Sequence, residues 1–255
     1  MLSQHSLAGR PTDRRNLLPS RDVNLLIIYS VFISEVYESF QGEGPLAGTP
    51  SLFIRTSGCN LRCSFCDTPY TSWDPQGEQI SLVMLTKQIE LSAAAHVVIT
   101  GGEPMLAPQL TELTDACRAA GRHVTIETAG TVRRSVECDL MAISPKMANS
   151  TPDDSRWRVR HEETRFQPAV IRTLLERFAS ILKFVIGTAE DVLEVQEWLT
   201  DFPEVTADQV WLMPQAVNQG ELERCAPLVQ QLARENGFCY SPRLHVEQFG
   251  DQRGV

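Results

Sequence analysis

The sequence lacks any long apolar run and any excess of basic residues. Its longest apolar stretch near the N-terminus, residues 23–32, contains Asn24, Tyr29 and Ser30 and is well short of the roughly 20 residues that span a bilayer. The 23 Lys and Arg are outnumbered by 32 Asp and Glu, a net charge of −9. Binding to nucleic acid rests mainly on basic surfaces. We therefore expect neither a membrane nor a direct nucleic-acid partner.

Cysteine is also scarce, with seven in 255 residues, too few for a secreted disulfide scaffold. The first 22 residues contain arginines but are not followed by a small-residue cleavage site, which argues against a signal peptide. We therefore expect a cytoplasmic location with reduced thiols. We interpret residues 1–30 as a flexible N-terminal extension, residues 31–255 as one domain, and the polar stretch 147–168 as a long loop or insertion.

What the sequence does contain is an alternation of apolar, β-branched runs with helical patterns. Continuous apolar strands separated by helices are typical of parallel βαβ units buried on both faces. The sequence predicts an α/β fold, a partial (open) (β/α) barrel with about six parallel strands. The expected strands are 51–56, 96–100, 123–127, 139–143, 181–186 and 209–213, and the expected helices are 82–94, 109–120, 169–178, 189–199 and 222–236.

Short polar motifs directly follow most of the predicted strands. Ligands of such folds gather where the carboxyl ends of the strands meet. We therefore expect these motifs to surround one site. They are TSGC (56–59), TGGEP (100–104), ETAG (127–130), SPK (144–146) and PQ (214–215).

Three of the seven cysteines form the pattern Cys59-x3-Cys63-x2-Cys66. Three thiolates on a short loop can hold one face of an iron–sulfur cubane and leave the fourth iron open, whereas electron carriers normally use four cysteines. A structural zinc site needs four closed ligands, and no further cysteine or histidine lies within about 20 residues of the three cysteines. Zinc and three inert thiols remain alternatives. The other cysteines are expected to be small buried apolar residues: Cys117, Cys138, Cys225 and Cys239.

This spacing resembles that of the radical S-adenosylmethionine (SAM) superfamily. Phe65 precedes the last cysteine, as in that superfamily, and the run Gly101-Gly102-Glu103-Pro104 matches its glycine-rich motif. The resemblance implies a radical SAM barrel with a [4Fe-4S] cluster bound by Cys59, Cys63 and Cys66. It also implies SAM as cofactor, which supplies the radical so that no protein side chain need do so, and a flavodoxin or ferredoxin-type electron donor.

A longer series of matches, over about residues 34–249, resembles the 7-carboxy-7-deazaguanine synthase family. That resemblance implies conversion of 6-carboxy-5,6,7,8-tetrahydropterin to 7-carboxy-7-deazaguanine with loss of ammonia. The reaction is that of a carbon–nitrogen lyase in queuosine and deazapurine biosynthesis. The family further implies Mg²⁺ and a homodimer. The matching runs are ESFQGEG (38–44), GTP (48–50), FIR (53–55), GCNL (58–61), DTPY (67–70), SPK (144–146) and RLH (243–245).

The same resemblance implies site roles for individual residues. Thr68 is expected to ligate Mg²⁺ through its hydroxyl. The expected substrate-binding residues are Phe40, Gln41, Gly42, Glu43, Arg55, Thr100 and His245. The expected SAM-binding residues are Phe65, Cys66, Asp67, Gly102, Ser144, Pro145, Lys146 and Gln215.

Less specific interpretations stand beside these roles. Arg55 offers a planar fork suited to a carboxylate but can also form an ordinary surface ion pair. Lys146 can be a solvated lysine, His245 a structural histidine, and Thr68 a turn residue. Ten residues follow His245, so a terminal carboxylate in the site, as in some members, is not assigned to Val255.

Two other functions fit parts of the sequence. A radical SAM activase that makes a glycyl radical on a partner protein would share the length and the cysteines. The QGEG segment and Arg55 fit it less well, because a protein substrate needs a broad docking surface. A non-enzymatic module stabilised by zinc or by an iron–sulfur cluster would contain the cysteines alone. Metal analysis separates the last case, since a zinc module would hold about one zinc and no iron per chain.

Overall fold

The computed structural model describes residues 29–255, so nearly all of the predicted N-terminal extension lies outside the described residues. The chain forms a nine-stranded sheet in the order β3-β1-β2-β4-β5-β6-β7-β8-β9. β1 runs antiparallel to β2 and β3, and all other neighbours pair in parallel. The strands are β1 (Ser30–Phe40), β2 (Pro50–Thr56), β3 (Glu78–Ser81), β4 (His96–Gly101), β5 (His123–Thr128), β6 (Leu140–Ile143), β7 (Ser180–Ile186), β8 (Val210–Pro214) and β9 (Cys239–Tyr240).

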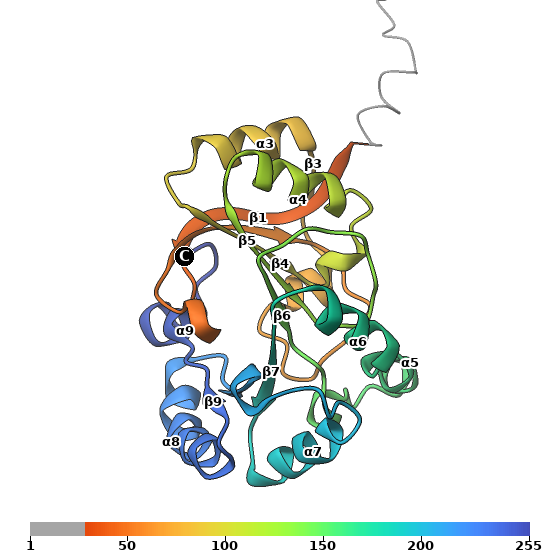
Figure 1. Cartoon of the computed structure of the whole chain (residues 1–255), viewed down its shortest axis with the longest axis vertical. Helices are drawn as coiled ribbons and strands as arrows, with labels where there is room; N and C mark the ends of the chain where they lie inside the picture. Colours follow the sequence, from red (N-terminus) through yellow and green to blue (C-terminus); the bar gives the residue numbers. More distant parts are fainter. Residues whose placement is uncertain (1–28) are drawn as a thin grey trace, which may run out of the picture.

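The sheet curls without closing, because within residues 29–255 its outer strands β3 and β9 do not pair with each other. Helices cover the outside of the curl (Figure 1). This confirms the predicted open α/β barrel, and the six predicted strands correspond to β2 and β4 to β8. The helices are α2 (Pro69–Ser72), α3 (Leu82–Leu91), α4 (Leu110–Ala119), α5 (Ser155–Arg165), α6 (Pro168–Arg177), α7 (Ala189–Leu199), α8 (Gln219–Asn236) and α9 (Leu244–Phe249).

The polar stretch 147–168 is not simply a loop, which corrects that interpretation. It contains the short 3-10 turn η3 (Ala148–Ser150) and the helix α5. Asp154 caps α5, since its side chain accepts a hydrogen bond from the Arg156 N–H. Only His161 of this helix is buried. A helix without an apolar stripe has no periodic signal in the sequence, which is why it was missed.

Local signals define the ends of the other helices. The Ser81 hydroxyl accepts a hydrogen bond from the Met84 N–H at the start of α3. Thr188 and Asp191 form a reciprocal capping box at α7, which satisfies two otherwise unpaired N–H groups. Gly237 ends α8 with φ +69°, a left-handed conformation that glycine adopts without a steric penalty.

A continuous core joins the helices to the sheet. Ile99 of β4, Ile126 of β5 and Leu182 of β7 are fully buried on the parallel part of the sheet. Trp198 of α7 stacks on Phe202 with ring centroids 4.2 Å apart and meets Phe184 of β7 edge-on. This packing holds the strands in register, so that the loops leaving their carboxyl ends are brought together.

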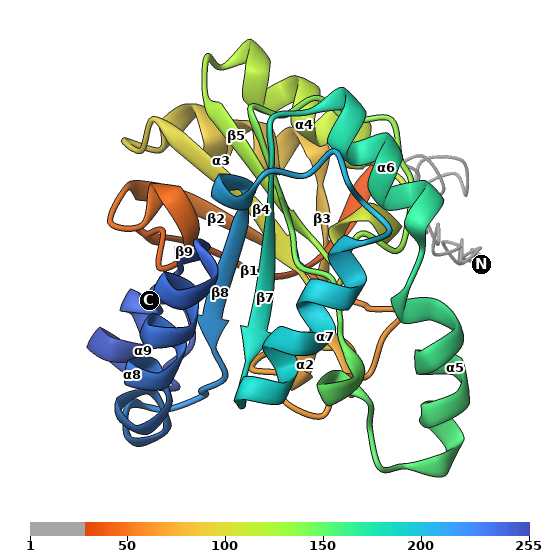
Figure 2. The same cartoon turned by 60° about the horizontal axis from the view of Figure 1, so that its bottom comes forward.

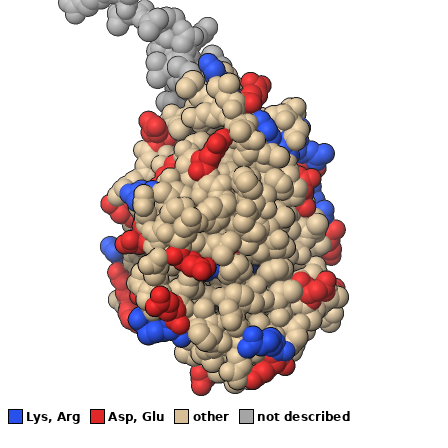
Figure 3. Space-filling model, turned by 90° about the vertical axis from the view of Figure 1, so that its left-hand side faces the viewer, with Lys and Arg blue, Asp and Glu red and all other residues tan. Residues whose placement is uncertain are grey.

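No helix among residues 29–255 is both long and apolar enough to cross a membrane. On the face seen in Figure 3, basic side chains are interspersed with acidic ones, and no continuous basic surface is visible there. This distribution fits the net charge of −9.

Candidate active site

A cavity of about 480 Å³ lies against the inner side of the sheet, below the loops that follow β2, β4, β5, β6 and β8. The expected site residues line it together, with one exception. Pro145 is buried and does not line the cavity, while its neighbours Ser144 and Lys146 do. The expected residues that line the cavity are Phe40, Gln41, Gly42, Glu43, Arg55, Cys59, Cys63, Phe65, Cys66, Asp67, Thr68, Thr100, Gly102, Ser144, Lys146, Gln215 and His245.

The three clustered cysteines lie on the loop after β2. Cys59, Cys63 and Cys66 pack with Leu61, Phe65 and Ala129 in a small apolar group. The loop is pinned from outside, because the Ser64 N–H donates to the Ser150 carbonyl (2.9 Å) and the Trp73 indole N–H to the Cys63 carbonyl (3.1 Å). No fourth cysteine among residues 29–255 lines the cavity.

The environment of these thiols fits iron. Burial raises the pKa of Cys59 and of Cys63 to about 12 each. A buried thiol with so high a pKa becomes a thiolate when a metal takes up its charge. Three cysteine sulfurs on one loop, without a fourth protein ligand, match a [4Fe-4S] cluster with one open corner, and they do not match a closed zinc site.

The glycine-rich motif after β4 packs directly on the cysteine loop. A Cβ atom on Gly102 would lie 2.3 Å from the Gly58 carbonyl oxygen and 2.6 Å from that of Thr71. Gly101 has φ +149°, which favours glycine. The buried Glu103 carboxylate accepts hydrogen bonds from the Met105 N–H, the Thr128 hydroxyl and the Ala129 N–H. Glu103 thereby ties this loop to the end of β5.

Gly102→Ala is expected to force the two loops apart, because its methyl group would meet backbone atoms that cannot rotate away. Overpacking of this kind costs about 1–3 kcal/mol, so we expect the free energy of unfolding to fall by that amount. Urea unfolding of the metal-free protein measures it. Gly220→Ala is the matched control, since its new Cβ would lie 3.4 Å or more from all neighbours. Equal stability of the two variants would contradict the close packing.

A charged cluster lines the cavity and includes two residues, Lys183 and Arg243, to which the sequence assigned no role of their own. Lys183 of β7 and Arg243 are almost fully buried, and both pair with Glu43. Arg243 also pairs with Asp67, and the His245 Nε2 lies 3.8 Å from a Glu43 oxygen. Glu127 approaches Lys183 at 3.9 Å. Lys183 was detectable as the lone charge within an apolar strand, ILKFVI.

These contacts set the charge states of the cluster. Burial by itself would raise the pKa of Glu43, but Lys183 and Arg243 outweigh it and hold that pKa well below its usual range. Burial would also raise the pKa of Asp67, but the Arg243 guanidinium outweighs this effect and lowers that pKa. Burial lowers the pKa of His245, which favours its neutral form. The cavity therefore presents ionised carboxylates beside a neutral imidazole.

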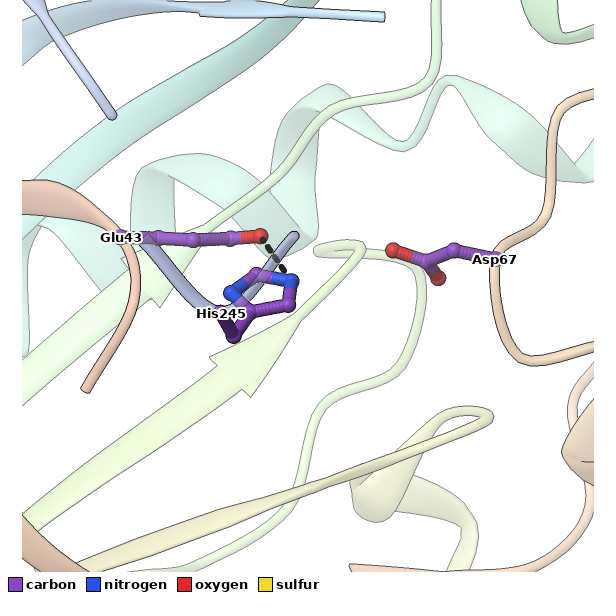
Figure 4. A group of neighbouring side chains, drawn as sticks. All are labelled: Glu43, Asp67 and His245. Carbon is purple, nitrogen blue, oxygen red and sulfur yellow. Dashed lines mark ion pairs between the residues drawn. The ribbon is translucent and has the colours of Figure 1, made fainter. Parts of the chain in front are cut away.

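Glu43, Asp67 and His245 place ligand atoms within 4.8 Å of one another, close enough to hold a metal ion (Figure 4). Lys183 and Arg243 already neutralise the two carboxylates, and their positive charges would repel a divalent cation. We interpret the three as an ion-pair network and not as a metal centre. The Thr68 hydroxyl, the expected Mg²⁺ ligand, lines the cavity 3.9 Å from the Cys66 sulfur.

Arg55 lies in the cavity wall and is held by two side chains of β1. Its Nε donates to Glu35 (2.8 Å) and its Nη2 to the Tyr37 hydroxyl (2.7 Å). The ion pair is therefore largely buried and not at the surface, with Arg55 16% exposed. Within residues 29–255 its Nη1 has no partner, so part of the guanidinium fork is available to a ligand in the cavity.

The segment after α9 also lines the cavity. The Arg253 guanidinium lies 3.4 Å from the Tyr70 ring centroid and 3.4 Å from Glu35. Neither Arg253 nor Glu35 belongs to the expected site residues. Contacts between the end of the chain and its beginning leave no local pattern in the sequence.

The predicted pterin-facing segment is packed closely. The Gln41 amide donates to Glu127 (3.1 Å), and its oxygen accepts from the Glu43 N–H (3.1 Å). A Cβ on Gly42 would lie 2.0 Å from the His245 Nδ1, so glycine is required for the imidazole to reach this position. Gly42 is thus not merely a turn residue.

Lys146 is not a freely solvated lysine, because its ammonium donates to the carbonyl and the hydroxyl of Ser144 (2.8 and 2.7 Å). Gln215 follows β8, as predicted, and its N–H donates to the Ile186 carbonyl. In the strand order, β4 and β5 separate β6 and β8 from β2, which bears Arg55. The loops after β6 and β8 thus present polar side chains to the cavity from a different side than Arg55.

Comparison with known proteins agrees with this geometry. The model of the radical SAM superfamily matches residues 53–215. The 7-carboxy-7-deazaguanine synthase of Rhodopirellula baltica is 44% identical over 230 residues, which cover 89% of each chain. That of Halobacterium salinarum is 40% identical over 86% of this chain and 90% of the relative.

A crystal structure of QueE from Escherichia coli superposes with a TM-score of 0.60 at 24% identity, and the match covers 88% of this chain and 98% of that one. At this identity the likeness shows the shared fold alone. Sequence, cavity and fold lead to the same assignment. The chain belongs to the radical SAM superfamily and, within it, to the family of 7-carboxy-7-deazaguanine synthases.

Proposed function

We propose that the protein is a carbon–nitrogen lyase that converts 6-carboxy-5,6,7,8-tetrahydropterin to 7-carboxy-7-deazaguanine with loss of ammonia, in queuosine or deazapurine biosynthesis. The observation that carries the proposal is that Cys59, Cys63 and Cys66 share one cavity with Glu43 and Arg55. The relatives with this name match along nearly the whole chain. A protein-activating enzyme would need a broad docking surface in place of this charged cavity.

In this proposal the three cysteines would hold the [4Fe-4S] cluster and leave its fourth iron to SAM, and SAM, once cleaved by one electron, supplies the radical for hydrogen abstraction. The close packing of the Gly102 loop on the cysteine loop lets backbone approach the cofactor. The remaining contacts to SAM would come from both sides of the cavity: Phe65, Cys66, Asp67, Ser144, Lys146 and Gln215.

The substrate would lie between Arg55 and the charged cluster. The free edge of the Arg55 guanidinium suits the substrate carboxylate. Glu43, kept ionised by Lys183 and Arg243, can accept hydrogen bonds from amino and ring N–H groups of the pterin. Gln41 and the backbone of Phe40 and Gly42 would align the pterin edge. Thr100 and the neutral His245 complete the proposed contacts.

Further features remain proposals from the family. One hydroxyl, that of Thr68, would ligate Mg²⁺, and because Mg²⁺ retains several waters and often binds substrate oxygens, a single protein ligand is sufficient. We also propose a homodimer, a flavodoxin or ferredoxin-type electron donor, and a cytoplasmic location.

Binding measurements test the substrate assignment. The anaerobically reconstituted protein with SAM should bind 6-carboxytetrahydropterin at least about tenfold more tightly than the same pterin with a methyl group in place of the carboxylate, because a charge-assisted hydrogen bond is lost. Equal affinity for the two pterins, or no binding of either, would contradict the assignment.

Arg55→Ala is expected to raise the KM for the carboxylated substrate about 10- to 100-fold, the loss of roughly 1.5–3 kcal/mol from hydrogen bonds to a charged group. Arg55→Lys keeps the positive charge but lacks the planar fork, so its KM should lie between those of the wild type and Arg55→Ala. Arg118→Ala removes an exposed ion pair with Glu137 and serves as control. An unchanged KM in Arg55→Ala, with the protein folded, would exclude the carboxylate role.

A further inference from the structure

The helix α5 has no part in the proposed reaction, yet it lies beside the cysteine loop. It stands at the edge of the molecule, apart from the helices that cover the sheet (Figure 2). Only His161 of this helix is buried, whereas Arg156, Arg158 and Arg160 are exposed and Val159 is 62% exposed.

Hydrogen bonds fix α5 to the loop that bears Cys63. The His161 Nδ1 accepts from the Arg62 N–H (3.2 Å), so a neutral imidazole carries its proton on Nε2. That nitrogen lies 2.9 Å from the Ser150 hydroxyl. Ser150 in turn accepts from the Ser64 N–H through its carbonyl. The helix and the cysteine loop therefore form one rigid surface.

An aromatic ring lies at the centre of this surface. The guanidinium groups of Arg62, Arg156 and Arg160 lie 4.5, 5.4 and 5.9 Å from the centroid of the Trp157 ring. Arg62 directly precedes the cluster ligand Cys63. Arg156 and Arg160 are exposed, while Arg62 is half-buried and donates from its guanidinium to the Cys59 and Leu61 carbonyls. Arginine and aromatic side chains are enriched at protein–protein contacts.

The part of this surface around Trp157 is basic within an acidic protein, whereas the acidic residues of α5 itself, Glu162 and Glu163, lie near the end of the helix, where Glu162 pairs with Arg165. Arg156 and Arg158 have acidic neighbours in Asp154 (3.6 Å) and Asp153 (3.1 Å), but these pairs are exposed and hence weak. Among residues 29–255, Arg62 and Arg160 have no ion-pair partner. The remainder of the chain brings the net charge to −9, so an acidic partner would be repelled by most of the protein and attracted here.

We propose that Arg62 and α5 form the docking surface for an acidic one-electron carrier protein of the flavodoxin or ferredoxin type, which reduces the cluster through the loop at Cys63. The inference rests on the proposed function. In the docked complex one electron passes from the reduced carrier to the cluster, so the carrier is oxidised and the cluster is reduced by one electron. Charge complementarity of this kind accelerates encounter and is weakened by salt.

Charge reversal tests the surface. In Arg156→Glu/Arg160→Glu, the rate at which a reduced flavodoxin bleaches the cluster's visible absorbance should fall at least about tenfold at low ionic strength, and the difference should shrink as salt is added. Reduction of the same cluster by dithionite should be unchanged. The matched control Arg224→Glu/Arg234→Glu places the same charge change on exposed positions of α8. Flavodoxin should reduce its cluster at the wild-type rate.

Three results would overturn the proposal: normal reduction of the α5 variant by the carrier, equal slowing of the α8 control, or equal slowing with dithionite. If charge reversal lowers the iron content, Arg156→Gln/Arg160→Gln replaces it, with a smaller slowing expected. Product formation with dithionite reports on the proposed function separately, because that reductant needs no docking surface.

Discussion

Cys63→Ala is expected to lose the iron–sulfur cluster and with it all turnover. Two remaining thiolates cannot hold a cubane whose fourth corner has no protein ligand. Iron and sulfide analysis after anaerobic reconstitution, together with the visible spectrum, measures the loss. Product formation should fall to the level of the reaction without enzyme.

A cysteine outside the cavity provides the control for this result. Cys239 lies in β9 and does not line the cavity, so Cys239→Ala should retain iron, sulfide and turnover. Retention of an intact cluster in Cys63→Ala, or its loss in Cys239→Ala, would contradict the assignment of the three ligands.

Lys183→Met is expected to lower the free energy of unfolding by about 3–5 kcal/mol, because it leaves the buried Glu43 carboxylate without its closest counter-charge. Substrate binding should weaken at the same time, since Glu43 would lose the ion pair that keeps it ionised and in place. Urea unfolding at neutral pH measures the first effect, and the KM for the pterin measures the second.

A double-mutant cycle isolates this pair. In Glu43→Gln/Lys183→Met no uncompensated charge remains between the two positions, so the double variant should be more stable than the sum of the single losses predicts. The pKa of Glu43 is lowered in the folded state, so its contribution is present above the usual pKa of 4.5 and fades as the pH falls below it. Additive losses, or a stability difference between wild type and Lys183→Met that persists at acidic pH, would refute the pairing.

The sequence predicted the parallel strands because their signal is local. Strands buried on both faces are rich in apolar and β-branched residues, and β2 and β4 to β8 are buried over most of their length. The polar motifs after these strands meet at one cavity because parallel strands bring their carboxyl ends to the same edge. β1 was missed because it mixes apolar residues with Glu35, Tyr37 and Glu38, two of which turn inward to hold Arg55 or line the cavity.

The missed site residues depend on contacts between distant parts of the chain. Lys183 reaches Glu43 across 140 positions, and Arg243 reaches Asp67 across 176. A buried lysine on an apolar strand indicates that a partner exists, but it does not say which carboxylate provides it. The helix α5 was missed for another reason, since it is held by polar contacts to the cysteine loop and not by an apolar face.

The central claim is that one cavity joins radical SAM chemistry to a carboxylated pterin. It is tested most directly by quantifying 7-carboxy-7-deazaguanine and ammonia together, after anaerobic incubation of the reconstituted protein with 6-carboxytetrahydropterin, SAM, Mg²⁺ and dithionite. The account predicts that both products appear in equal amounts with wild type and that neither appears with Cys63→Ala. Unchanged pterin in the presence of an intact, reduced cluster would contradict it.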